Sequence, residues 1–307
     1  MIFGTPISWF VNEIVAVVLL LICIAHALKR DRPAVRLLEL FCYMLTAGIF
    51  ENIGVFGKIY YYSIERIMMF GNVPFSILFI EGAILYATIL LIEHLRLPVW
   101  AIPFSVGVLS SIQDMTLDPS SVFDLHNING VMEGQWNWTK HYAGGFVDIP
   151  FFNFSGWMTM MLFFTTFTLI GRWIHEKKQK DWIGIAYPIA SIAATLLLLI
   201  SPVNQFLLYA MPFVGMNNKA AELIMLIVNF SVGIFFLLKF SKYRPFDMKR
   251  DKIMLCIPAF LHIYAFVSSI VLGITAAIVP VAVVAAIHCG YLIWIYRKCN
   301  GQTTPAT

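Results

Sequence analysis

Charged side chains are scarce in this chain of 307 residues: Asp, Glu, Lys and Arg make up 12% of it, and hydrophobic residues make up 60%. Soluble domains carry about 25% charged residues, so this composition excludes an ordinary soluble fold. It indicates a protein whose solvent is the lipid bilayer. The net charge of +4 comes with no basic stripe, so we expect no nucleic-acid partner.

Reactive and metal-binding side chains are also few. The five cysteines show no C-x-x-C spacing and are expected to be inert thiols. The seven histidines never cluster as a zinc or di-iron site requires, which argues against a desaturase and predicts no metal and no cofactor. His262 and His288 lie in the middle of apolar segments, where we expect buried core histidines. No lysine lies inside a late apolar segment, which argues against a retinal-type photoreceptor.

Long apolar runs dominate the chain instead. Lipid offers no partner to unpaired backbone groups, so segments that cross about 30 Å of hydrocarbon should be helices. We therefore predict an all-α, polytopic membrane bundle that forms a single domain over residues 1–307. Nine segments are long enough to cross the bilayer: 9–28, 35–56, 73–95, 98–116, 153–174, 182–202, 218–240, 253–274 and 276–297.

The positive charges support about nine helices. Lys and Arg gather after the first, third, fifth, seventh and ninth segments, as cytoplasmic loops require; only Lys58, Arg66, Lys140 and Lys219 fall on the other side. Seven or eight helices would break this alternation unless one segment were re-entrant. We expect an integral protein of a prokaryotic plasma membrane, with its N-terminus outside and its C-terminus in the cytoplasm. The first segment lacks a cleavage site and is predicted to be a retained helix.

One connection differs from the others in its length and its residues. Residues 117–152 belong to the outer side and combine acids, histidines and glycines with many aromatic residues, which argue against disorder. We expect this loop to cap an active site, because the outer half of the membrane should also hold several acids. Buried acids are costly in hydrocarbon and are usually functional. The acids in question are Glu13, Glu51, Glu81, Asp114 and Asp118.

Asp114 and Asp118 are spaced at i and i+4, which places both on one helical face. Pro119 predicts that the helix ends at Asp118. In a dry site, burial and a like charge nearby would keep one of the two as a neutral acid, able to deliver a proton near neutral pH. Two alternatives remain: water-facing residues that end the helix, and a D-x-x-x-D magnesium site for a prenyl diphosphate. The latter lacks a second acidic cluster, since the second half of the chain offers only Glu222 within a helix.

Glu51 is the second candidate acid. Gly54 and Gly57 follow it closely and would allow another helix or a substrate to approach. Glu51 and Glu81 could instead be acids that hydrogen-bond a neighbouring helix. The aromatic residues of this region could form an interfacial belt or a pocket that steadies a cationic intermediate, and the two roles are compatible. These residues are Trp136, Trp138, Tyr142 and Trp157.

An ordered series of short motifs runs through this part of the chain: "FENIGVFGKIYYY", "NVP", "DMTLDP", "GQWNW", a tyrosine, two glycines and "IPFFNFSGW". The series, over about residues 45–165, resembles the carotenoid biosynthesis membrane proteins that include the carotenoid 1',2'-hydratases, such as bisanhydrobacterioruberin hydratase. The matching positions are Glu51, Asp114, Asp118, Trp136, Trp138, Tyr142, Asn153 and Trp157. The sequence departs from the family pattern at Glu81, where an aromatic residue is more usual, and at Asp148, where we expect an apolar one.

The resemblance implies a hydratase that adds water across the terminal C=C of an acyclic carotenoid. Asp114, Asp118 and Glu51 would be catalytic, and the aromatic residues with Asn153 and Glu81 would bind the apolar isoprenoid substrate. Such a reaction needs a neutral acid, a tertiary cation and water, which fits acids at the edge of the hydrocarbon beneath an aromatic roof. A proton-initiated cyclase would share the first step. A small transporter or a carotenoid-binding protein is the non-enzymatic alternative, although no internal repeat supports a transporter.

Overall fold

The computed structural model describes residues 1–211, 217–248 and 250–300; Lys249, one of the basic residues after the seventh segment, lies outside them. Within the described residues, each of the nine predicted segments forms a long helix, so the all-α polytopic bundle is confirmed. The helices are α1 (Ile7–Ala27), α2 (Pro33–Phe56), α3 (Phe75–His94), α4 (Ile102–Val122), α5 (Phe151–Lys178), α6 (Asp181–Leu199), α8 (Lys219–Phe240), α9 (Ile253–Val271) and α10 (Thr275–Asn300). A short 3-10 turn (Val99–Ala101) precedes α4, and the short helix α7 (Pro202–Tyr209) follows α6.

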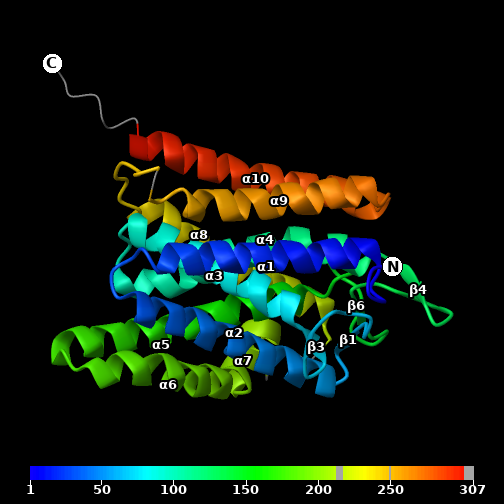
Figure 1. Cartoon of the computed structure of the whole chain (residues 1–307), viewed down its shortest axis with the longest axis horizontal. Coiled ribbons are helices and arrows are strands. Elements are labelled where there is room, and N and C mark those ends of the chain that lie inside the picture. The colour runs from blue at the N-terminus through cyan, green and yellow to red at the C-terminus, as the bar shows by residue number, and fades with distance from the viewer. Residues whose placement is uncertain (212–216, 249, 301–307) are drawn as a thin grey trace.

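The long helices run along a common direction (Figure 1). The N-terminus and the short strands lie at one end of the bundle, and the last helix ends at the other. The pair α9 and α10 forms one side and the pair α5 and α6 the opposite side, with α1 to α4 and α8 between them. Eight of the long helices are apolar enough to cross a membrane.

The remaining long helix, α4, is polar and central. It packs against α3, α5, α8, α9 and α10, and its serines, Gln113 and Asp114 are buried among them. Gly107 allows α5 to come close, because a Cβ there would lie 2.7 Å from the carbonyl oxygen of Met158. The prediction that the helix ends at Asp118 is wrong: α4 continues to Val122 with Pro119 inside it. Proline removes one backbone donor, and the packing of the surrounding helices outweighs that loss.

Two connections that are distant in sequence meet at the strand-bearing end. The strand β1 (Tyr60–Tyr62), which follows α2, pairs antiparallel with β6 (Trp136–Trp138) from the long loop, with Tyr60 opposite Trp138 and Tyr62 opposite Trp136. The loop thus has structure of its own, including the hairpin of β4 (His126–Ile128) and β5 (Val131–Glu133). A further small hairpin, β2 (Met69–Phe70) with β3 (Val73–Pro74), leads into α3.

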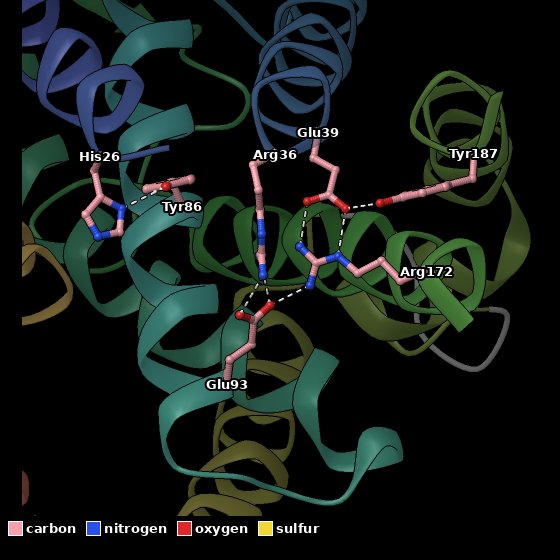
Figure 2. A network of polar contacts seen from close by, with 7 residues as sticks. All are labelled: His26, Arg36, Glu39, Tyr86, Glu93, Arg172 and Tyr187. Atoms are coloured by element: carbon pink, nitrogen blue, oxygen red, sulfur yellow. Dashed lines mark hydrogen bonds and ion pairs between the residues drawn. The ribbon is translucent and has the colours of Figure 1, made fainter. Parts of the chain in front are cut away.

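An ion-pair network fastens four helices together at the other end (Figure 2). The Arg172 guanidinium of α5 donates to both carboxyl oxygens of Glu39 on α2, at 2.7 and 2.6 Å, and also to Glu93 on α3. Arg36 donates to both oxygens of Glu93, at 3.2 and 3.3 Å. The Tyr187 hydroxyl of α6 donates to Glu39. Bidentate contacts of this kind fix how far each helix lies along the bundle.

Arg172→Met should destabilise the protein strongly, because it leaves the buried Glu39 carboxylate without its cation and the half-buried Glu93 carboxylate with Arg36 alone. Breaking a buried ion pair costs about 3 kcal/mol or more. Thermal unfolding in detergent should show this as a large drop in the midpoint. Arg36→Met is the matched control and should cost less, because Glu93 keeps Arg172. Equal midpoints for the two variants would contradict the central role of Arg172.

The charge alternation predicts that the strand-bearing end lies outside the cytoplasm. Reporter domains inserted after Gly130, in the turn of the β4–β5 hairpin, and after Gln179, between α5 and α6, should report opposite sides of the membrane. The insertion after Gly130 should be the external one. Reporter signals from the same side of the membrane at both positions would contradict this orientation.

Candidate active site

Four buried carboxyl groups gather toward the strand-bearing end of the bundle. Glu51 comes from α2, Glu81 from α3, and Asp114 and Asp118 from α4; each is at most 7% exposed. None of the four forms a salt bridge within the described residues. Carboxylates without a cation are unfavourable in a dry interior. Hydrogen bonds and shared protons must therefore stabilise these four groups.

The two aspartates share one amide donor. The Asn153 side chain, from the first turn of α5, donates to Oδ2 of Asp114 at 3.0 Å and to Oδ2 of Asp118 at 2.6 Å. The spacing of four residues on α4 makes this possible, since both carboxyls point the same way. Two ionised carboxylates this close, without a cation, would repel each other strongly. The pair is therefore arranged to hold a proton between its members.

Glu51 is held by two phenols. The hydroxyls of Tyr60 and Tyr62 donate to its Oε2 atom at 2.7 and 2.6 Å. Gly54 makes this contact possible, because a Cβ at that position would collide with the Tyr60 hydroxyl. Burial and then the Glu51 carboxyl raise the pKa of Tyr60 and of Tyr62 well above 10, so both phenols stay protonated and act as donors.

A small cavity of about 20 Å³ joins these two groups of residues. It is lined by residues from the ends of α2, α3, α4 and α5 and from the paired strands β1 and β6. Tyr60 packs edge-on against Trp138, with ring centroids 5.0 Å apart. The residues that line it are Glu51, Tyr60, Tyr62, Ile77, Asp118, Trp136, Trp138, Asn153 and Trp157.

A second, more apolar cavity of about 110 Å³ adjoins the first. Glu51, Tyr60, Trp138, Asn153 and Trp157 line both. The second cavity extends between α2, α5 and α7, along apolar side chains. One of its lining residues, Ile53, is 42% exposed on the outside of α2. The remaining lining residues are Phe50, Gly54, Ile59, Phe152, Gly156, Met160, Leu208 and Tyr209.

Most of the residues predicted for the site line the first cavity, and three do not. Asp114 lies behind Asp118, and its Oδ1 atom has no hydrogen-bond partner among the described residues. Glu81 is fully buried and accepts one long hydrogen bond, of 3.4 Å, from the Tyr43 hydroxyl. Tyr142 lies farther out, where its ring packs on Phe152, which in turn packs on Trp138.

Tyr60 and Tyr62 were not predicted as site residues. The run of three tyrosines after α2 could have indicated them, because alternate residues of a short strand point to the same, buried side. In the structure, Tyr60 and Tyr62 are buried while Tyr61 is 41% exposed. Which strand they pair with could not be read from the sequence, since β6 lies far away in the chain.

The arrangement suits proton transfer to an apolar acceptor. One member of the aspartate pair, Asp118, and the separate Glu51 carboxyl group face the same cavity, and aromatic rings form much of its remaining surface. Aromatic faces attract a cation that develops between them. Across the described residues, no three His, Cys, Asp or Glu side chains are grouped as a metal site requires.

Comparison with known proteins gives one match. A family model described as "Carotenoid biosynthesis protein" matches residues 11–216, which is more than half of the chain. The matched range contains every residue that lines the two cavities, whereas α8, α9 and α10 lie beyond it. No curated protein and no solved structure matches the chain.

Proposed function

Because this chain belongs to the carotenoid biosynthesis protein family, we propose that it is a membrane hydratase of an acyclic carotenoid or a related isoprenoid. The enzyme adds water across a terminal C=C bond and needs no cofactor. One observation carries the proposal: Asp118, which shares the Asn153 amide with Asp114, and the Glu51 carboxyl held by two phenols face one small aromatic cavity. An acid and a base are thus offered to the same substrate atoms.

The reaction begins with proton transfer from the aspartate pair. Asp118, which lines the cavity, gives its proton to the less substituted carbon of the alkene, and the π electrons form the new C–H bond. The other carbon becomes a tertiary cation. Asp114, in contact with Asn153 and turned away from the cavity, then shares the charge left on the pair. Placing a general acid in this way contributes about 10²-fold or more to the rate.

Water captures the cation and completes the addition. The water oxygen bonds to the tertiary carbon, and one of its protons passes to Glu51, whose Oε1 atom makes no hydrogen bond among the described residues. Return of that proton to the aspartate pair resets the enzyme, so the sum is alkene plus water giving a tertiary alcohol. The buried indole N–H of Trp138 also lacks a partner in the described part of the chain. Such a group usually marks a site for a water molecule.

The larger cavity supports an apolar substrate that enters from the lipid. Its walls between α2, α5 and α7 carry aliphatic and aromatic side chains, and it meets the first cavity at Glu51 and Trp138. A carotenoid end could reach the acids along this path while the rest of the molecule stays in hydrocarbon. The strand-bearing loop would cap the reacting end on the non-cytoplasmic side and limit the entry of bulk water.

Expression of the protein in a host that accumulates lycopene tests the reaction. We expect a new product heavier than the substrate by one water, and activity in isolated membranes that persists with EDTA, because no diphosphate has to be neutralised. A product of unchanged mass with a new ring would replace hydration by proton-initiated cyclisation. Loss of turnover with EDTA and its return with magnesium would favour the D-x-x-x-D prenyl-diphosphate function.

Removing the acids while keeping their shape should stop turnover. Asp118→Asn and Asp114→Asn are each expected to lower the rate about 10²-fold or more, because the proton donor or its partner is lost. Glu51→Gln should also lower it, since water would lose its proton acceptor. Product formation in membranes, normalised to the amount of folded protein, is the measurement.

Asp181→Asn is the matched control for these variants. Asp181 is an exposed acid at the start of α6 and lies outside both cavities. Its substitution should leave turnover close to that of the unaltered enzyme. If the Asn variants of Asp114 and Asp118 both keep near-normal rates and only Glu51→Gln is inactive, the proton donor is Glu51 and the roles proposed for the two aspartates are wrong.

A further inference from the structure

A larger cavity lies on the opposite side of α4 and β6 from the carboxyl site. It measures about 450 Å³ and is bounded by α1, α4, α9 and the residues that follow α4. Neighbouring residues divide the two sites: Asp118 and Trp136 line the carboxyl cavity, whereas Ser120 and Gln135 line this one. Adjacent residues at the start of β6 face different cavities, and so do residues two apart on α4.

The floor of this cavity is a polar cluster. The Ser8 hydroxyl donates to Oδ1 of Asp124 at 2.9 Å. The Nε2 atom of His126 lies 2.9 Å from the Ser8 oxygen and 3.0 Å from the same carboxyl oxygen. Gln135 donates to the other oxygen of Asp124 at 3.3 Å. Asp124 and Gln135 are only 3% and 4% exposed, so the cluster is built into the protein and is not a solvated surface.

A second layer of residues holds the floor in place. Arg66 donates to the side-chain and backbone oxygens of Gln135, both at 3.2 Å, and lies over the ring of Trp9. Burial lowers the pKa of Arg66 to about 10, so it remains charged near neutral pH. Glu13 lies 3.6 Å away and balances that charge. The Trp9 indole donates to the backbone oxygen of Asp124 at 3.1 Å.

The walls of the cavity are apolar and face the lipid. Val11 on α1 and Val267 on α9 are 45% and 47% exposed, and both line the cavity. A ligand could therefore keep a long apolar part between α1 and α9 and still reach the polar floor. This combination of a polar floor and lipid-facing walls fits an amphiphile.

The charges and geometry of the floor narrow the ligand class. Its carboxyl group, Asp124, would repel an anionic head such as a phosphate, and Arg66 is already paired. The cluster is not arranged as a hydrolytic triad, because Ser8 and Asp124 meet the same nitrogen of His126, whereas a triad uses both ring nitrogens. Carboxylate, imidazole, amide and hydroxyl groups together can both donate to and accept from a neutral hydroxyl.

We propose that this cavity binds a long-chain amphiphile with an uncharged hydroxyl head. The head lies against Asp124, His126 and Ser8, and the chain lies between α1 and α9. An isoprenoid alcohol and a neutral glycerolipid of the bilayer share this chemistry. The site is formed by residues other than those of the proposed hydration, so its existence and the hydratase activity succeed or fail separately.

The test uses the full-length protein in detergent and geranylgeraniol that carries a diazirine next to its hydroxyl end. After photolysis, peptide mass spectrometry should find the label on residues 7–12 and 264–272. Excess unlabelled geranylgeraniol should remove the label, whereas the hydrocarbon of the same chain without its hydroxyl should not. If dioleoylglycerol removes the label and unlabelled geranylgeraniol does not, the site exists and its ligand is a bilayer lipid. Equal competition by the hydrocarbon, or label elsewhere only, would overturn the proposal.

One variant, with a matched control, tests the apolar wall of the cavity, and another variant tests its polar floor. Val267→Trp fills the cavity and should abolish the labelling, while Ile263→Trp, equally lipid-facing on α9 but outside the cavity, should keep it. Ser8→Ala removes one hydrogen-bonding group and should weaken competition by the alcohol about three- to tenfold. Because Ser8→Ala adds no bulk, it remains informative even if Val267→Trp fails to fold. Unchanged labelling in Val267→Trp, or unchanged competition in Ser8→Ala, would contradict the assignment.

Discussion

The cost of a bare carboxylate in hydrocarbon governs the architecture of this protein. The two ends of the bundle meet that cost in different ways. At one end, Glu39 and Glu93 are neutralised by Arg172 and Arg36, which makes them inert fasteners. At the other, the partners of Asp114, Asp118 and Glu51 among the described residues are an amide, the neighbouring carboxyl group and phenols. A carboxyl group that forms hydrogen bonds but no ion pair can still hold a proton and give it away. Protonation of an apolar substrate requires such a group.

The two ends are also mechanically linked, because the same helices contribute to both. The helix α2 carries Glu39 in its first half and Glu51 near its end, α5 carries Asn153 in its first turn and Arg172 in its second half, and α3 carries Glu81 and Glu93. Ion pairs at one end therefore set how far each helix lies along the bundle. Since a helix rises 1.5 Å per residue, a slip of one residue would separate Asn153 from the aspartates. The ion pairs thus fix the geometry of the candidate site, although they lie at the other end of the bundle.

Hydropathy and charge alternation were enough to predict the nine helices, because the bilayer imposes length and polarity on every span. The spacing of Asp114 and Asp118 predicted a shared face, and both now bind Asn153. Local rules failed where tertiary packing decides: α4 runs through Pro119, and Tyr142 lies one ring beyond the cavity. The contact of Tyr60 and Tyr62 with Glu51 depends on the pairing of β1 with β6, which no local pattern specifies.

The polarity of α4 has a consequence for how the protein enters its membrane. An insertion machinery that passes segments into lipid one by one, according to their hydrophobicity, would not release α4 alone, because its serines, Gln113 and two aspartates would meet acyl chains. The preceding helix α3 is strongly apolar, and 89% of its most apolar stretch is buried inside the bundle. Because α4 packs against α3 and α5, we expect α4 to leave the insertion machinery together with these neighbours.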